Sequence, residues 1–292
     1  MKRETSLGRA TVKQVCEAFH VSRQAYYQAT KPLAESPKAV VADRRGPWVT
    51  NGVLVTCIRQ VVAENPGWGS RKVWAILRRD GIKASRKRVW KLMQVLGLCL
   101  PAPSHEVRTR YEGHVSVPDS NRRWGTDLTT VWTRADGVVA IVPVIDFGDR
   151  YALDCVVTKS QESAPVLAAT RSALVREFVR PSEVPAGLEL RTDHGPQFVG
   201  RDAEALCNRW RLDHTFAPVG RPTGNAVTER FILTLKTELI WTRDWNSKEE
   251  LAVAVRDWLE HYNNRRPHQA LAWRTPAEQR AMNLKPQERK AA

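Results

Sequence analysis

Trp124-Gly125-Thr126-Asp127-Leu128-Thr129-Thr130-Val131-Trp132 is rich in β-branched and aromatic residues, and residues 137–146 and 150–157 have the same character. Short turns near residues 135–137 and 148–150 separate the three segments, which predicts three antiparallel strands. A helix at about 161–178, a strand at 188–191, a helix at about 200–210 and a strand at 213–217 follow, and helices at about 225–240 and 247–262 close the pattern. This order predicts an α/β fold, a mixed sheet with helices packed on it.

Three acidic residues stand in distinctive settings along this segment. Asp127 lies in the first strand, Asp193 follows a later strand, and Glu229 lies in a helix. A turn after Asp193 would leave its carboxylate at the exposed tip of the strand, where ligands of such sheets tend to bind. Three carboxylates from distant parts of one chain can hold two divalent cations, which clamp the attacking and leaving oxygens of a phosphodiester. The pattern therefore indicates a DNA-processing enzyme.

Other polar residues near these carboxylates have several interpretations. Lys236 follows Glu229 by two helical turns, so both face the same way, and it can hold a phosphate or a base beside the metal site. His194 could assist proton transfer or only order its turn. Asp146 and Asp149 flank an apparent turn and are interpreted as capping residues.

The charge of the chain indicates a polyanionic partner. Its 292 residues carry a formal net charge of +15. Residues 1–120 hold 21 Lys and Arg against 9 Asp and Glu, so most of the excess precedes the three carboxylates. The five cysteines are scattered without a Cys-x-x-Cys pair, which disfavours a zinc finger and suits reduced thiols in a cytosol. No uncharged apolar run reaches the length of a membrane span, so we expect a cytoplasmic, nucleoid-associated protein.

Two helical units are expected before the sheet. Residues 10–29 have the pattern of a helix-turn-helix, whose second helix carries Arg23 and Tyr26 as candidate DNA contacts. Residues 53–98 predict three amphipathic helices, with Ser70 and Ser85 as caps of the second and third. The polar face of this second unit is dense in cations, which can neutralise phosphates. The candidate DNA contacts there are Arg71, Lys72, Arg86, Lys87 and Arg88.

Longer motifs reveal a resemblance to a known family. The chain resembles insertion-sequence transposases of the OrfB type in the IS-three family, whose catalytic core is similar to that of retroviral integrases. The resemblance is carried by the segments 21–27, 68–74, 121–127, 192–195, 224–226, 262–271 and 275–276. It implies an RNase-H-like fold in which Asp127, Asp193 and Glu229 form a D,D(35)E triad that binds two Mg²⁺ ions, for which Mn²⁺ can substitute.

The resemblance also implies partners and a domain plan. The partners are double-stranded DNA at the element ends and at the target, further copies of the chain, and an upstream OrfA product joined by a frameshift fusion. The expected domains are 1–45, a helix-turn-helix and linker; 46–118, a second helical DNA-binding domain and linker; 119–280, the catalytic core; and 281–292, a tail. Two departures from the family pattern, Gly224 and Arg230, bear on DNA contacts and on activity.

Two alternatives share some of these features. A non-catalytic or decayed protein that occupies element ends would have the same basic N-terminal part, but the intact carboxylates argue against it. An RNase-H-type nuclease that cuts without joining would need no helix-turn-helix units. The sequence thus favours a transposase that cleaves and transfers DNA strands.

Overall fold

The computed structural model describes residues 48–101, 117–217 and 224–284. The helix-turn-helix expected at residues 10–29, with Arg23 and Tyr26, lies outside the described residues.

A three-helix unit begins the described part of the chain. Its helices are α3 (Asn51–Glu64), α4 (Ser70–Arg79) and α5 (Arg86–Val95). The hydroxyl of Ser85 accepts a hydrogen bond from the backbone N–H of Arg88, 3.2 Å away, so Ser85 caps α5 as expected. Ser70 is instead the first residue of α4, and the preceding Gly69 provides no capping side chain. The helices enclose a small apolar core of their own, which includes Leu54, Ile58, Val73, Val89 and Met93.

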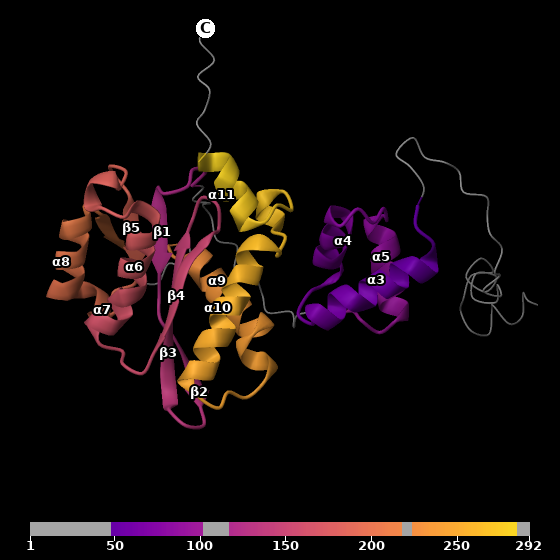
Figure 1. Cartoon of the computed structure of the whole chain (residues 1–292), viewed down its shortest axis with the longest axis horizontal. Coiled ribbons are helices and arrows are strands. Elements are labelled where there is room, and N and C mark those ends of the chain that lie inside the picture. Colours follow the sequence, from indigo (N-terminus) through magenta and orange to yellow (C-terminus); the bar gives the residue numbers. More distant parts are fainter. Residues whose placement is uncertain (1–47, 102–116, 218–223, 285–292) are drawn as a thin grey trace, which may run out of the picture. The chain divides into compact units, whose positions relative to one another are not determined.

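A mixed six-stranded sheet forms the centre of the remaining structure (Figure 1). Its strands are β1 (Arg123–Thr126), β2 (Thr129–Thr133), β3 (Gly137–Asp146), β4 (Ala152–Thr158), β5 (Glu189–Thr192) and β6 (Asp213–Phe216). β3 pairs antiparallel with β1, β2 and β4, whereas β5 is parallel to β1 and β6 is parallel to β5. The three antiparallel strands predicted at the start of the sheet are present, with the first divided in two.

The division of the first strand occurs at Asp127. Thr126 pairs with Val144 and Thr129 pairs with Ile141, so the register along β3 is unbroken and Asp127 falls opposite Pro143. Proline has no backbone N–H to donate to a neighbouring strand. The ladder is therefore weak at this point, and Asp127 lies in a gap between two regular strands.

Helices cover both faces of the sheet and bury both sides of β3. Val142 and Val144 pack with α6 (Ser163–Phe178) and α8 (Arg201–Trp210), whereas Ile141 and Ile145 pack with α9 (Ala226–Glu238) and α10 (Lys248–Asn264). Successive strand residues point to opposite faces, which is why β3 is a nearly continuous apolar run. The sheet is thus the middle layer of three (Figure 1), the RNase-H-like arrangement expected from the sequence.

Several short elements complete the structure. They are α7 (Pro196–Val199), α11 (Pro276–Leu284) and the 3-10 turns η1 (Pro181–Glu183), η2 (Ile240–Thr242) and η3 (Gln269–Leu271). The sequence analysis did not anticipate α7 or α11. Across the described part of the chain, no helix combines the length and the apolar character needed to cross a membrane.

Candidate active site

Asp127 occupies the gap between β1 and β2 and is half-buried. Its Oδ1 accepts a hydrogen bond from the backbone N–H of Leu128, 2.7 Å away, which fixes the carboxylate beside the strand end. Burial raises the pKa of Asp127 to about 6, and the negative charges of Asp193 and Glu229 contribute to the rise. The three predicted carboxylates therefore interact electrostatically.

Asp193 directly follows β5, the strand beside β1. The parallel register pairs Gly125 with Arg191, and the same offset two residues further places Asp127 opposite Asp193. The Oδ1 of Asp193 accepts a hydrogen bond from the backbone N–H of Gly195, 3.0 Å away, so the turn after the strand orients this carboxylate. Two acidic side chains thus stand at the carboxyl ends of neighbouring parallel strands, where sheets of this kind place ligands.

Glu229 lies in the first turn of α9 and is exposed. The buried side chains of Phe231 and Leu235 pack this helix against the sheet. Lys236 lies two turns after Glu229, and its positive charge lowers the pKa of Asp127. The structure therefore brings Lys236 into the electrostatic environment of the carboxylates, on the side of α9 that carries Glu229.

A close approach of backbone to side chain sets the position of α9. A Cβ atom at Gly125 would lie 2.3 Å from Thr228 Oγ1 and 2.4 Å from Phe147 Cε1. Only glycine leaves room for Thr228, the neighbour of Glu229, to pack on β1.

We expect Gly125→Ala to lower both the stability of the chain and the DNA cleavage that the sequence predicts. The added methyl group overpacks the contact, which costs about 1–3 kcal/mol, and it displaces Glu229 from Asp127. Cleavage by folded protein, measured below its unfolding temperature, checks the second effect. Gly52→Ala is the control, because a Cβ there meets nothing within 4 Å. Equal cleavage by the two variants would show that Gly125 does not position Glu229.

Asp127→Asn is expected to raise the melting temperature at pH 8 in EDTA. The folded pKa of Asp127, about 6, exceeds its ordinary value of 3.8, so folding disfavours the charged form. The stabilising contribution of Asp127 is complete below its ordinary pKa and is lost as the pH rises through about 6. Melting curves from pH 8 downwards should show the difference in melting temperature between the variant and the wild type disappear as the pH falls below about 6. A variant that melts below the wild-type chain at pH 8 would contradict this account.

The donor atoms at this site suit a hard divalent cation. Carboxylate oxygens are the ligands that Mg²⁺ and Mn²⁺ prefer. Among the described residues, however, no three Asp, Glu, His or Cys side chains are gathered closely enough to hold an ion. Burial is the main cause of the raised pKa of Asp127, and the charges of Asp193 and Glu229 add to it; a bound cation would offset both effects.

The candidate DNA contacts of the helical unit have different surroundings. Arg71, Arg86 and Lys87 are exposed and have no ion-pair partner among the residues that the structure describes. Lys72 Nζ instead lies 2.6 Å from Glu238 Oε1, and Arg88 donates to Asn51 Oδ1 and to the Val49 carbonyl. Lys72 and Arg88 therefore have structural partners in the absence of DNA.

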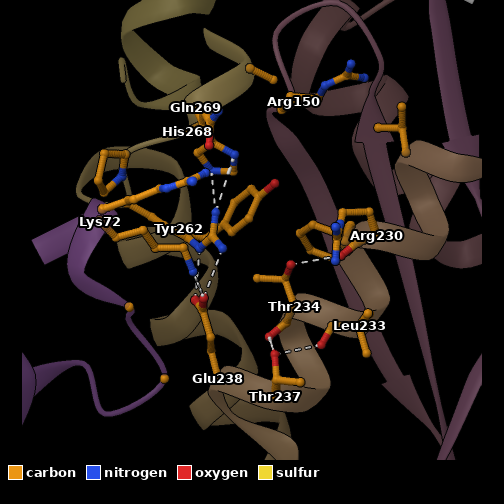
Figure 2. A pocket seen from close by; sticks show the side chains of 18 of the residues that line it. Lys72, Arg150, Arg230, Leu233, Thr234, Thr237, Glu238, Tyr262, His268 and Gln269 are labelled. Carbon is orange, nitrogen blue, oxygen red and sulfur yellow. Dashed lines mark hydrogen bonds and ion pairs between the residues drawn. The ribbon is translucent and has the colours of Figure 1, made fainter. Parts of the chain in front are cut away.

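Sequence reasoning missed two buried charge clusters. Arg280 of α11 contacts Asp146 and Asp149, with its nitrogen 3.3 and 2.7 Å from their oxygens, so these aspartates are not merely turn caps. Glu238 at the end of α9 is held by Lys72 and by Arg266, which donates two hydrogen bonds of 2.9 Å (Figure 2). The partners are far apart in sequence, so no local pattern pointed to either cluster.

Comparisons with protein families agree with this architecture. Residues 51–104 match an HTH-like domain, and residues 118–222 and 210–276 match two families described as integrase core domains.

Two curated relatives cover most of the chain. A transposase for insertion sequence element IS629 from Shigella sonnei is 27% identical over 91% of this chain and 90% of that protein. Transposase InsD for insertion element IS2A/D/F/H/I/K from Escherichia coli is 32% identical over 77% of this chain and 78% of that protein.

Solved structures are more distant. A chain of the simian T-cell lymphotropic virus intasome in complex with the PP2A regulatory subunit B56 gamma gives a TM-score of 0.48 at 15% identity, covering 76% of this chain and 74% of that chain. The HTLV-2 integrase catalytic core with magnesium gives 0.40 at 16% identity, covering 55% of this chain and 97% of that chain.

Proposed function

The chain belongs to the insertion-sequence transposases of the IS-three family, with an integrase-like core, and on that premise we propose that it cleaves and joins DNA strands at the ends of an insertion sequence. The reaction is a metal-dependent phosphodiester transesterification at Asp127, Asp193 and Glu229. The observation that carries the proposal is the placement of Asp127 and Asp193 at the carboxyl ends of the neighbouring parallel strands β1 and β5, where the negative charges of Asp193 and Glu229 act on Asp127.

The three carboxylates would hold the metal ions of the reaction. Asp127 and Asp193 would contact two Mg²⁺ ions, and Glu229 would complete the coordination of one. Bound there, the ions supply activation of the attacking oxygen and stabilisation of the leaving oxygen. Because the carboxylates are not yet gathered at ligand distance, binding has to draw them closer together.

The remaining groups position the DNA. Lys236, on the same side of α9 as Glu229, would hold a phosphate near the reacting bond. The exposed cations Arg71, Arg86 and Lys87 would contact phosphates of the element end. Little covalent chemistry falls to the protein, so placement and charge stabilisation account for most of the rate.

A cleavage assay tests the proposal. Purified chain is incubated with labelled duplex DNA from the ends of its own element, with Mg²⁺, with Mn²⁺ or with EDTA. We expect nicked or joined products with either cation and none with EDTA. Because the family resemblance implies an OrfA partner and a multimer on DNA, the assay is repeated with the OrfA fusion. Intact DNA in both forms of the assay would reject the catalytic proposal.

A further inference from the structure

A cleft separate from the three carboxylates lies beside α9. It has a volume of about 860 Å³ and is bordered by α9, the start of α4 and the segment that follows α10 (Figure 2). Neither Asp127, Asp193 nor Glu229 lines it. The cleft is nevertheless close to them in the fold, because Arg230, which follows Glu229, forms part of its wall.

The walls of the cleft carry far more positive than negative charge. Five cationic side chains line it, whereas Glu238 is its one acidic residue among the described part of the chain. The cations are Arg71, Lys72, Arg150, Arg230 and Arg266. Glu238 is already shared, since its oxygens lie 2.6 Å from Lys72 Nζ and 2.9 Å from Arg266 Nε.

Three arginines of the cleft are left without a carboxylate partner among the described residues, namely Arg71, Arg150 and Arg230. Arg150 is half-buried and donates one hydrogen bond, of 2.6 Å, to the carbonyl of Phe147. Burial of a guanidinium that has five donors is costly unless an anion or further acceptors complete its contacts. The remaining N–H groups of Arg150 are not fully buried, so they are available to an anion that enters the cleft.

The excess of positive charge contributes to lowered pKa values in the cleft. The pKa of His268 is held well below its ordinary value by burial and by the charges of Arg266, Lys72 and Arg150. The pKa of Lys72 is also lowered, by burial and by the nearby arginines, although Glu238 opposes the shift. An anion in the cleft would relieve the repulsion among these groups.

We propose that this cleft binds the phosphodiester backbone of DNA, with Arg150 and Arg230 as contacts to phosphate. The inference rests on the proposed function, because DNA is the anion that this protein would hold next to Glu229. Arginine is well suited to the task, since its planar fork can donate two hydrogen bonds to one phosphate. The cleft would thus bind the part of the DNA that adjoins the part in the active site.

The salt dependence of DNA binding tests the proposal. A fluorescein-labelled duplex of arbitrary sequence is titrated with protein in EDTA at several salt concentrations, so the result does not depend on cleavage. Each phosphate contact contributes about 0.9 to the slope of log affinity against log salt. We expect Arg150→Gln/Arg230→Gln to lower the slope by about 1.8. Arg230→Gln alone, at an exposed position, should lower it by about 0.9.

The matched control removes the same charge elsewhere. Arg201 and Arg209 are exposed on α8, on the opposite face of the sheet, so Arg201→Gln/Arg209→Gln should leave the slope unchanged. If the cleft variants and the control variant change the slope equally, the proposal is wrong even where Mg²⁺-dependent cleavage is intact. If the variants lower the slope but DNA stays intact with the chain and with its OrfA fusion, the result would support DNA binding by the cleft and reject the catalytic function.

Photocrosslinking tests the location without altering charge. Benzoylphenylalanine in place of Leu233, an exposed residue that lines the cleft, should crosslink to the same duplex. The control position is Val175 of α6, which is similarly exposed but lies outside the cleft. Crosslinks of equal yield at both positions would overturn the proposal.

Discussion

Asp193→Ala is expected to abolish Mg²⁺-dependent cleavage and strand joining while DNA binding stays nearly unchanged. Asp193 stands opposite Asp127 at the ends of two parallel strands, so its loss removes a ligand that both proposed metal positions share. Charge stabilisation by metal ions contributes several kcal/mol to such a reaction, and a loss of about 4 kcal/mol lowers the rate about a thousandfold. The rate of product formation from labelled element ends, together with a binding isotherm in EDTA, measures both effects.

A matched control separates the loss of a ligand from the loss of a charge. Asp202 is exposed on α8, so Asp202→Ala removes one negative charge away from the strand ends and should cleave at the wild-type rate. Cleavage by Asp193→Ala at that same rate would show that the carboxylate has no catalytic role. If the wild-type chain and its fusion bind element ends without cutting them, the chain is a decayed DNA-binding protein.

Arg280→Met is expected to cause the largest loss of stability. The guanidinium joins Asp146 and Asp149, both completely buried, to the C-terminal helix α11. Removing one partner of a buried ion pair leaves an uncompensated charge and costs about 3–5 kcal/mol. Urea unfolding at pH 8 measures the loss. Arg256→Met is the control, because the pair between Arg256 and Asp257 is exposed and is worth at most about 1 kcal/mol.

The cost of Arg280→Met should depend on pH. Burial, together with the charge of Asp149, raises the pKa of Asp146 to about 6, above its ordinary value of 3.8. The folded state therefore binds the proton of Asp146 more tightly than the unfolded state does. The stabilisation that comes from protonated Asp146 is lost as the pH rises through about 6. The unfolding midpoints of the variant and the wild type should converge as the pH falls towards 5. A difference that is constant from pH 8 to pH 5 would show that the charges of Asp146 and Asp149 are not responsible.

The layout of the sheet could be predicted from local patterns because those patterns reflect burial. The alternation along β2 and the continuous apolar run of β3 correspond to one and two covered faces, respectively. The interruption at Asp127 could not be predicted, since it depends on the residue of β3 that lies opposite. Pro143 is distant in sequence and becomes its neighbour only through the register of the hairpin.

The site was only partly accessible to sequence reasoning. Strong local motifs indicated Asp127, Asp193 and Glu229, but the reason that α9 approaches β1 lies in the contact between Gly125 and Thr228. The ion pair between Lys72 and Glu238 could not be predicted either, because the two residues are 166 positions apart in the sequence. Arg280 was missed for a related reason. A charged residue near a polar end of the chain resembles a solvated one until its buried partners are known.

The metal centre is the central claim, and anomalous scattering from crystals of the chain with element-end DNA and Mn²⁺ tests it most directly. The account predicts two Mn²⁺ peaks, both in contact with Asp127 and Asp193 and one also in contact with Glu229. Mn²⁺ bound elsewhere in a well-ordered DNA complex, with no ion on these three carboxylates, would contradict it.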